Sequence, residues 1–451
     1  MRCTRGLQRA SGAALAVLGF STCASAPPAA TPHPPKHFNA PAGGYRPARP
    51  FRVGVLGATG AVGQRFLEHL EGHPWFTVTR LGASERSAGK TYAEAANWMV
   101  TPNVPASYSD MRVVGCTPED FGGVDLVFSA LVRLGLGAAA RAAMSPLGAR
   151  DQLAHPAPTR PRPPPPHTCT LQDAPVAATV EPAFRDAGVP VFSNARNFRM
   201  TPDVPLVVPQ VNGDHLDMVR GQASFAASGG YIVTNANCST TGMVIALAPL
   251  QAAFGIEAVH ATTLQAISGA GYPGLPSLDI LDNVVPYISG EEDKLETEYA
   301  KIMGALTLSG SPAAPRAHIA HPGFPLSAMV NRVHVRDGHC IALSVKLSRP
   351  ATPEQVSAAL EAWRPKEALV STLPSAPPAF ILVRREVNRP QPRLDRDTGN
   401  GFTTVVGRVR ADPVYTVKMF VLSHNTVMGA AGSSILNAEL AAAKGLLKHR
   451  A

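Results

Sequence analysis

Apolar and polar residues in the first half of the chain follow the pattern of strands that alternate with helices. A short apolar run, 51–56, precedes a glycine-rich turn and the amphipathic stretch 64–70. Later apolar runs are short and bounded by turn residues, which is typical of buried strands. This order predicts a parallel sheet covered by helices. The strands are expected at 51–56, 78–83, 124–130, 189–193 and 205–208.

Beyond residue 238 the apolar segments alternate differently and indicate a mixed sheet. The strands are expected at 259–266, 332–335, 341–347 and 414–422, and the helices at 243–254, 282–303, 353–363 and within 427–447. The fold class is therefore α/β, with a Rossmann-type dinucleotide-binding domain (51–237) and an α+β domain with a mixed sheet (238–422). The last stretch, 423–451, is expected to return as a helix to the first domain.

Residues 132–172 interrupt this pattern. They contain a proline tract at 161–166 and no sustained hydrophobic period, so we expect a disordered insertion. Joining Leu131 to Asp173 would restore a strand, a loop and a helix. Val132-Arg133 can begin with GT and Leu171-Gln172 can end with CAG, and the segment is therefore interpreted as a retained intron or a gene-model error.

The first fifty residues contain Arg2, Arg5 and Arg9 but no acidic residue. This composition is typical of an organelle transit peptide, and we expect delivery to the chloroplast stroma, with the mitochondrion as the alternative. A secretory signal stays open, because the apolar stretch 12–20 precedes Cys23. That stretch is too short to span a bilayer, so no membrane association is expected.

Composition narrows the possible functions of the chain. Its 451 residues are 45% hydrophobic and 16% charged, as in a globular enzyme. The net charge of +9 is concentrated in 1–50 and 132–172. The remainder is nearly neutral, which argues against nucleic-acid binding. The six cysteines form no CxxC pair and the histidines no HExxH pair, so no metal site is expected.

The run 57–63, Gly-Ala-Thr-Gly-Ala-Val-Gly, lies between a predicted strand and a predicted helix. Glycines there allow the backbone to approach a pyrophosphate, whose charge the helix N-terminus favours. Ser84, Arg86 and Ser87 follow the next strand and suit a ribose 2′-phosphate, which predicts NADP. The candidate cofactor contacts are Gly57, Thr59, Gly60, Ala61, Val62, Gly63, Ser84, Arg86 and Ser87.

Cys238 lies between the apolar run 231–233 and the helix-compatible stretch 243–254. The N–H groups and positive dipole end of a helix favour a thiolate, which makes Cys238 a candidate nucleophile. The alternative is a cysteine that only packs, because free cysteine is among the most buried residue types.

Several motifs in order resemble the fungal and archaeal branch of the aspartate-semialdehyde dehydrogenases. The similarity covers residues 52–131 and 173–447. Its motifs are 57–63, 82–90, Asn197 with Arg199, Asn237-Cys238-Ser239-Thr240, 264–271, 289–294, and Arg332 with His339 seven residues later.

The resemblance implies NADPH-dependent reductive dephosphorylation of L-aspartyl-4-phosphate to aspartate 4-semialdehyde. Cys238 would attack the acyl phosphate and His339 would serve as general acid/base. The resemblance also implies that the second domain catalyses and dimerises, giving a homodimer or homotetramer. The remaining implied contacts are Arg332 for the substrate carboxylate, Glu291 for its ammonium, Gln265 for its acyl group, Arg199, Lys294 and Asn197 for phosphate, and Asn425 near the nicotinamide.

The sequence departs from the fungal pattern at Met329-Val330 and at Cys340-Ile341, which flank Arg332 and His339. Outside the family register, Glu291 and Lys294 would be interpreted as an exposed i,i+3 pair. Two other functions stay open: malonyl-CoA reduction on the same scaffold, and a catalytically silent nucleotide-binding isoform.

Overall fold

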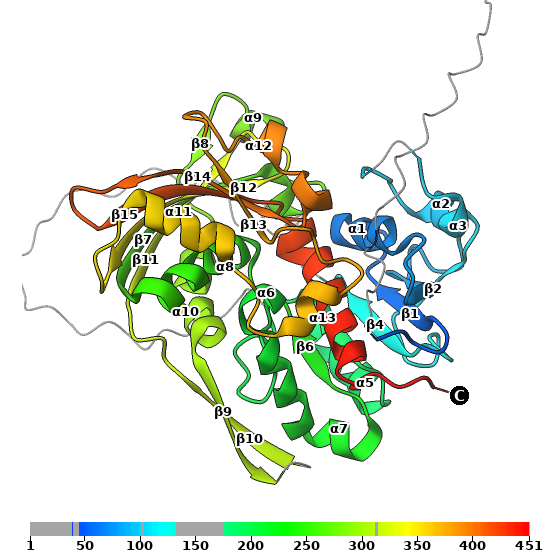
Figure 1. Ribbon diagram of the computed structural model, residues 1–451. Coiled ribbons are helices and arrows are strands. Elements are labelled where there is room, and N and C mark those ends of the chain that lie inside the picture. The colour runs from blue at the N-terminus through cyan, green and yellow to red at the C-terminus, as the bar shows by residue number, and fades with distance from the viewer. Residues whose placement is uncertain (1–37, 39–44, 101–102, 132–174, 312–313, 451) are drawn as a thin grey trace, which may run out of the picture. The chain divides into compact units, whose positions relative to one another are not determined.

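The computed structural model describes residues 38, 45–100, 103–131, 175–311 and 314–450 (Figure 1). The expected transit peptide lies outside the described residues except for Phe38 and the segment 45–50. The expected insertion, 132–172, lies outside them entirely. Among the described residues, no helix is both long enough and apolar enough to cross a membrane.

The first sheet is parallel and has six strands in the order β3-β2-β1-β4-β5-β6. The strand order reverses between β1 and β4, and ligands of such sheets bind at the carboxyl ends of the strands beside this reversal. The strands are β1 (Phe51–Leu56), β2 (Phe76–Gly82), β3 (Val113–Val114), β4 (Leu126–Ser129), β5 (Val191–Ser193) and β6 (Ile232–Thr234).

The connections of this sheet carry helices and short helical turns. Helix α1 follows the glycine-rich turn and packs on β1 and β2. The elements are α1 (Ala61–Leu70), α2 (Tyr92–Ala95), α3 (Ala106–Ser109), α5 (Pro175–Asp186), α6 (Pro209–Asn212), η1 (Gly213–Gly221) and α7 (Ala223–Ser228).

The second sheet is mixed and has seven strands in the order β13-β14-β15-β12-β7-β11-β8. Strands β7 and β11 run parallel, so that Gln265 at the end of β7 lies beside Arg332 of β11. The strands are β7 (Ile256–Gln265), β8 (Val284–Val285), β11 (Leu326–Val333), β12 (His339–Leu347), β13 (Ile381–Arg384), β14 (Thr404–Ala411) and β15 (Val417–Ser423).

Three helices pack on the mixed sheet: α8 (Cys238–Phe254), α10 (Glu291–Met303) and α11 (Pro353–Ala362). In β12, Leu343 and Val345 are buried, Ser344 between them is half-buried, and Ala342 and Lys346 on either side of them are exposed. This alternation shows that one face of the sheet is covered and the other is accessible. The remaining elements are η2 (Ile267–Ala270), α9 (Ser277–Ile280), η3 (Ala368–Thr372), α12 (Pro392–Asp395) and η4 (Thr398–Gly401).

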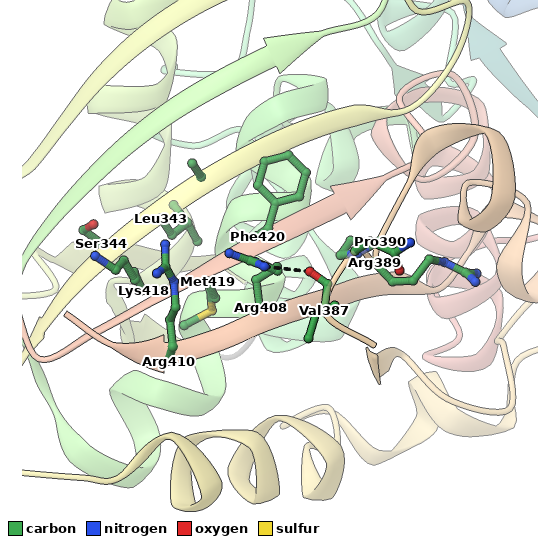
Figure 2. Close-up of a pocket in the computed structure, with 12 residues that line it drawn as sticks. Leu343, Ser344, Val387, Arg389, Pro390, Arg408, Arg410, Lys418, Met419 and Phe420 are labelled. Atoms are coloured by element: carbon green, nitrogen blue, oxygen red, sulfur yellow. Dashed lines mark hydrogen bonds between the residues drawn. The ribbon is translucent and has the colours of Figure 1, made fainter. Parts of the chain in front are cut away.

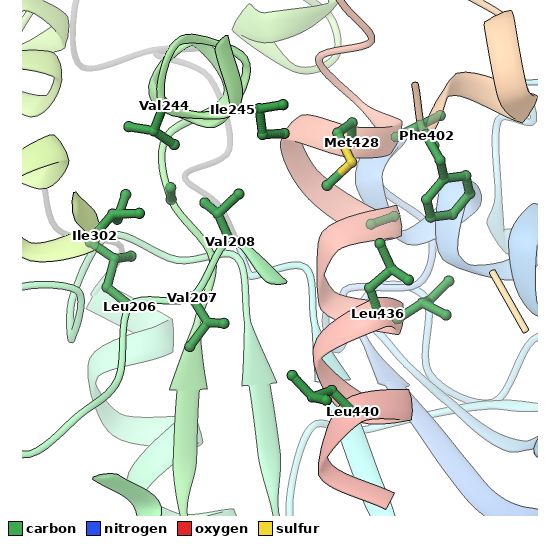
Figure 3. Packing of buried hydrophobic residues seen from close by; sticks show 14 of the residues in the cluster. Leu206, Val207, Val208, Val244, Ile245, Ile302, Phe402, Met428, Leu436 and Leu440 are labelled. Carbon is green, nitrogen blue, oxygen red and sulfur yellow. The ribbon is translucent and has the colours of Figure 1, made fainter. Parts of the chain in front are cut away.

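The C-terminal segment packs against β5 of the first sheet. It consists of a π-helical turn, η5 (Val427–Ala431), and helix α13 (Gly432–Ala443), which is buried along most of its length. Leu436 and Leu440 belong to one buried cluster that also includes Val207 beside β6 and Val244 of α8 (Figure 3). The apolar core is therefore continuous between the two sheets.

Two element predictions are wrong. The helix expected at 282–303 begins only at Glu291, because Pro286 lacks a backbone N–H and Gly290 adopts a left-handed φ of 64°. Residues 205–208 form a single bridge, Leu206 with Thr234, and no strand. Pro205 is the first residue of this segment and Pro209 follows it, and neither can donate a ladder hydrogen bond.

Some expected elements have different ends in the structure, and some strands of the structure were not expected. The strand expected at 332–335 is β11 and begins at Leu326, since its alternating residues pair with β7 from Val259 onward. The strands that the sequence did not predict include β13, β14 and an exposed hairpin, β9 (Ala305–Ser311) with β10 (Ala314–Ala320). The mixed sheet is therefore larger than its apolar runs indicate.

Candidate active site

Cys238 is the first residue of α8 and directly follows the end of β6 through the turn 235–237. The side chain of Asn237 caps this helix by accepting from the N–H groups of Ser239 and Thr240 at 2.9 and 3.2 Å. The sulfur of Cys238 lies 3.2 Å from Nε2 of His339. Two predicted residues that are 101 positions apart are therefore brought into contact.

The hydrogen bonds of His339 define its tautomer. The backbone N–H of Ala266 donates to Nδ1 at 3.0 Å. A backbone amide can only donate, so Nδ1 carries a lone pair and the proton of the neutral ring lies on Nε2, facing the sulfur. Burial, assisted by the Arg332 guanidinium, lowers the pKa of His339 to about 3. The imidazole is therefore neutral at physiological pH.

The pKa of the Cys238 thiol shifts in the direction opposite to the sequence-based expectation of a favoured thiolate. Burial, followed by the carboxylate of Glu291, raises its pKa to about 11. The cations Arg332, Lys294 and Arg199 act in the opposite sense but do not outweigh burial. In the absence of a ligand, the thiol form of Cys238 therefore predominates near neutral pH.

Glu291 is the first residue of α10 and is buried beside Cys238. Its carboxylate accepts from Nζ of Lys294 at 2.6 Å and from Nδ2 of Asn237 at 2.8 Å. Gln265, which is also buried, donates to it at 3.4 Å. Burial alone would raise the pKa of Glu291, but the Lys294 ammonium and these hydrogen bonds outweigh it and lower the pKa. Glu291 is therefore an anion within the site.

Arg332 extends from β11 toward the same centre and is buried. Its Nη1 donates to the carbonyl oxygen of Ala266 at 2.7 Å. Gly269 makes room for Arg332 and His339, since a Cβ there would lie 2.7 Å from Nη1 of Arg332 and 3.0 Å from Cε1 of His339. The turn after β7 thus holds both Arg332 and His339 through the backbone of Ala266.

Arg199 lies in the segment that follows β5, and its side chain is buried. Nη1 donates to Glu298 at 2.9 Å and Nη2 to the carbonyl oxygen of Asn194 at 2.9 Å. Nε is buried and has no hydrogen-bond partner among the described residues. Asn197, two positions earlier, is half-buried. Arg199 is near enough to Cys238 to act on the pKa of its thiol.

The glycine-rich turn lies at the carboxyl end of β1. Gly57 has a φ of 73°, which glycine adopts readily, and the Ala58 N–H donates to the carbonyl oxygen of Gly82 at 2.9 Å. A Cβ at Gly63 would lie 2.3 Å from the carbonyl oxygen of Gly57, whereas at Gly60 it would meet that oxygen at 3.4 Å. Thr59, Ala61 and Val62 are half-buried.

The residues proposed for the 2′-phosphate form an exposed turn after β2. The Ser87 N–H donates to the carbonyl oxygen of Ser84 at 2.8 Å, and Arg86 between them is exposed. Because β2 pairs with β1, this turn lies beside the glycine-rich turn. The two predicted parts of the cofactor site therefore lie along one edge of the parallel sheet.

Asn425 uses its amide within the protein. Its Oδ1 accepts from the Gly338 N–H at 2.8 Å, and its Nδ2 donates to Oγ of Ser268 at 2.8 Å. It therefore joins the turn before His339 to the loop after β7. These contacts hold Asn425 beside the catalytic cluster.

Matches to known proteins cover most of the chain. A model described as "Semialdehyde dehydrogenase, NAD binding domain" matches residues 52–144 and 169–219, and one described as "Semialdehyde dehydrogenase, dimerisation domain" matches 247–428. Aspartate-semialdehyde dehydrogenase of Schizosaccharomyces pombe is 43% identical over 403 residues, covering 88% of this chain and 99% of that protein. The chain belongs to the aspartate-semialdehyde dehydrogenase family. The resemblance identified from the sequence motifs is thereby confirmed.

Other members of the aspartate-semialdehyde dehydrogenase family agree in sequence and fold. The protein of Archaeoglobus fulgidus is 42% identical over 390 residues, covering 86% of this chain and 97% of its own length. A crystal structure of the Candida albicans enzyme with NADP has a TM-score of 0.71 and 41% identity, and covers 88% of this chain and 99% of that one. The predicted α/β class with a dinucleotide-binding domain and a second mixed-sheet domain is confirmed.

Glu298 and Lys301, which contact the predicted site residue Arg199, were not predicted from the sequence. Both are on α10, seven and ten positions after Glu291. Glu298 is 2% exposed and contacts both Arg199 and the backbone of Asn237. The only local signal is the spacing, which places these residues on the same side of the helix as Glu291 and Lys294.

A pocket of about 410 Å³ lies on strands β12, β14 and β15 of the mixed sheet (Figure 2). Its lining includes Arg408 and Arg410 of β14 and Lys418 of β15, and Arg408 donates to the carbonyl oxygen of Val387 at 2.7 Å. The pocket contains none of the predicted catalytic, substrate or cofactor residues. Among the residues that the structure describes, no group of three or more His, Cys, Asp or Glu is arranged to hold a metal ion.

Proposed function

We propose that the protein catalyses the NADPH-dependent reductive dephosphorylation of L-aspartyl-4-phosphate to L-aspartate 4-semialdehyde, a step toward lysine, threonine, methionine and isoleucine. The observation that carries this proposal is the 3.2 Å contact between the Cys238 sulfur and Nε2 of His339, surrounded by Arg332, Lys294 and Arg199. A thiol beside three cations suits an anionic acyl phosphate.

Cys238 forms a bond from its sulfur to the acyl carbon, and the bond between that carbon and the phosphate oxygen breaks. Inorganic phosphate leaves with the bridging oxygen, and a thioester remains on Cys238. After reduction of the thioester carbonyl carbon, the carbon–sulfur bond breaks, the aldehyde leaves and the thiolate is restored. Sulfur suits both halves because it is a strong nucleophile and a good leaving group.

His339 serves in this geometry as a hydrogen-bond donor. Its Nε2–H stabilises negative charge on the sulfur and can donate a hydrogen bond to an oxygen that develops charge next to the sulfur. To act as a base at Nε2, the neutral ring would have to move its proton to Nδ1, which faces the Ala266 N–H. The thiol proton is therefore expected to pass to a phosphate oxygen of the substrate or to water.

The substrate's amino-acid end is assigned to three buried groups. Arg332 keeps further guanidinium donors after its bond to Ala266 and would bind the α-carboxylate. The anionic Glu291 would hold the ammonium group, and Gln265 beside it would orient the acyl group. Arg199 and Lys294 would bind the phosphate, with support from Asn197.

The turn 57–63 fits the pyrophosphate of a dinucleotide. The backbone at Gly63 has no room for a Cβ, while Gly60 is exposed at the start of α1, where N–H groups favour an anion. The exposed Arg86, between Ser84 and Ser87, suits the 2′-phosphate of NADP. Bound NADPH supplies the hydride that reduces the thioester. Asn425 is assigned to the nicotinamide end because it lies beside the His339 turn.

The proposal is tested by assaying the purified protein with aspartate semialdehyde, inorganic phosphate and NADP, and in parallel with malonyl-CoA and NADPH. We expect phosphate-dependent reduction of NADP. Turnover of the coenzyme A thioester alone would replace the proposed substrate, and absence of both activities in a folded preparation would favour a silent isoform.

We propose that the protein forms a homodimer or homotetramer through the accessible face of its mixed sheet. Support comes from the dimerisation-domain match at 247–428 and from Met329 on β11, which is 54% exposed. Light scattering on the eluting protein would give its mass. A monomer at micromolar concentration would contradict the proposal.

We propose that residues 1–50 direct the protein to the chloroplast stroma and that 132–172 derive from a retained intron. The arginine-rich, acid-free composition supports the first proposal. The proline tract, and the family match that omits 145–168, support the second. A fluorescent fusion of residues 1–50 tests the destination, and sequencing of the transcript tests the insertion.

A further inference from the structure

One side of α10 carries four charged residues, Glu291, Lys294, Glu298 and Lys301. Their spacing places them along a single face of the helix. Glu291 and Glu298 are 8% and 2% exposed, so this charged face is directed into the protein. Glu291 and Lys294 belong to the proposed substrate site, whereas Glu298 and Lys301 have no part in the mechanism above.

Glu298 joins two parts of the proposed site that come from different segments. Its Oε2 accepts from the backbone N–H of Asn237 at 2.6 Å, and Asn237 immediately precedes the nucleophile. Its Oε1 accepts from Nη1 of Arg199 at 2.9 Å. A single buried carboxylate therefore connects the start of α8 to the guanidinium assigned to phosphate.

Lys301 holds the backbone of the same segment. Its Nζ donates to the carbonyl oxygens of Arg199, Thr201 and Val204 at 2.7, 2.7 and 2.8 Å. Burial lowers the pKa of Lys301 to about 8. Helix α10 therefore fixes Arg199 twice, through its side chain by Glu298 and through its backbone by Lys301.

A buried ion pair is weak evidence for stability, because desolvating two charges offsets their attraction. The geometry here indicates a different use. Glu298 and Asn194 occupy the two terminal nitrogens of Arg199, while its buried Nε has no partner among the described residues. The guanidinium is thus held in one orientation, while its Nε–H and the second N–H of each terminal nitrogen are not used by these two bonds.

We infer that Glu298 is a positioning residue that sets Arg199 relative to Cys238 for recognition of the phosphoryl group. The inference rests on the proposed function, in which Arg199 binds phosphate. Loss of the Glu298 charge should release the Arg199 guanidinium and weaken one hydrogen bond at the start of α8. It should therefore weaken the binding of inorganic phosphate more than the binding of aspartate semialdehyde or NADP.

The test compares Glu298→Gln with Glu296→Gln. Glu296 is an exposed residue of the same helix that also accepts from a backbone N–H, that of Ala328 at 2.8 Å. In the phosphorylating direction, E298Q should raise the KM for inorganic phosphate by about tenfold, with the KM for aspartate semialdehyde and NADP within about twofold. E296Q should match the wild type in all three.

A second readout does not need turnover. Inorganic phosphate should slow alkylation of Cys238 by iodoacetamide, and the concentration for half protection should rise by about tenfold in E298Q. If E298Q does not fold, Glu298→Asp, which keeps the charge but shortens the side chain, should show a smaller increase in the same measurement.

The inference is overturned if the phosphate concentration for half protection of Cys238 is the same in the folded E298Q variant as in the wild type. It is also overturned if all three KM values rise equally. In an active wild type, either result leaves the proposed reaction intact. A wild type without activity that is still protected by phosphate would reject the reaction but not the role of Glu298. Wild type without phosphate protection would overturn the inference, since Arg199 would then have no phosphate to bind.

Discussion

The turn 57–63 and the cluster around Cys238 differ in which part of the chain would contact the ligand. The turn would contact its ligand through the backbone of consecutive residues, and its geometry depends on missing side chains at Gly57 and Gly63. The cluster offers side chains from β7, α8, α10, β11 and β12, held by hydrogen bonds that include the charged groups of Glu291, Lys294 and Arg332. One region is sensitive to added volume, and the other to altered charge.

This difference affects how each region is expected to fail. Volume added to the turn displaces backbone and weakens folding and cofactor binding together. Altered charge in the cluster changes the reactivity of Cys238 and the binding of anions, while the apolar core around α8 is retained. Substitutions in the turn should therefore lower stability and activity together, whereas substitutions in the cluster should lower activity alone.

The largest effect is expected from Cys238→Ala. Turnover should fall by roughly 10⁴-fold or more, because the covalent step has no replacement. NADP affinity and the urea midpoint should stay near wild type, since the substitution leaves the turn 57–63 untouched. Cys340→Ala, which removes another buried thiol, should retain activity. Activity of C238A near that of the wild type would remove the cysteine from the mechanism.

Gly63→Ala tests the other region. Its Cβ would lie 2.3 Å from the carbonyl oxygen of Gly57, and relief of this overlap should cost about 1–3 kcal/mol of stability. The displaced turn should weaken NADP by about 5- to 150-fold, measured by fluorescence titration. Gly60→Ala is the control, because its Cβ meets no atom closer than 3.4 Å. It should weaken NADP while leaving urea unfolding unchanged; equal destabilisation by both would contradict the comparison.

The turn could be predicted from sequence because all its determinants are local. Strand, glycines and helix follow one another within 51–70, and the structure has the same order. The wrong strand at 205–208 shows the limit of local apolar patterns. Its one β-bridge is to Thr234, while Leu206 and Val208 bond through their backbone to the side chain of Asn212, and Pro205 and Pro209 prevent a longer ladder.

The cluster could be predicted only in part. Cys238 has a local signal, but the direction of its pKa shift does not follow from that signal, because burial and Glu291 come from the tertiary structure. Glu298 was missed because its partners, Asn237 and Arg199, are 61 and 99 positions away. Charged residues at helical spacing look the same in sequence whether they are exposed or buried.

Arg86→Ala probes the edge of the cofactor region that consists of side chains. The KM for NADP should rise by about tenfold, because a charge-assisted contact to the 2′-phosphate is lost. The KM for NAD, which lacks this phosphate, should not change. Arg80→Ala, an exposed arginine on β2, is the matched control. An equal effect on both cofactors would place Arg86 outside the 2′-phosphate site.

The smallest effect is expected when one of the charges around Cys238 is removed. Glu291 raises the pKa of this thiol, so Glu291→Gln should lower that pKa and increase the thiolate fraction at pH 7.5. Alkylation by iodoacetamide should then be about three- to tenfold faster than in the wild type. Turnover should fall, because the substrate's ammonium group loses its partner. Glu292, on the same helix turn, accepts from the backbone N–H of Val330 at 3.2 Å. As the control, Glu292→Gln should alter neither the alkylation rate nor turnover. Slower alkylation in E291Q would mean that Glu291 activates the thiol, and that the charges of the cluster favour the thiolate.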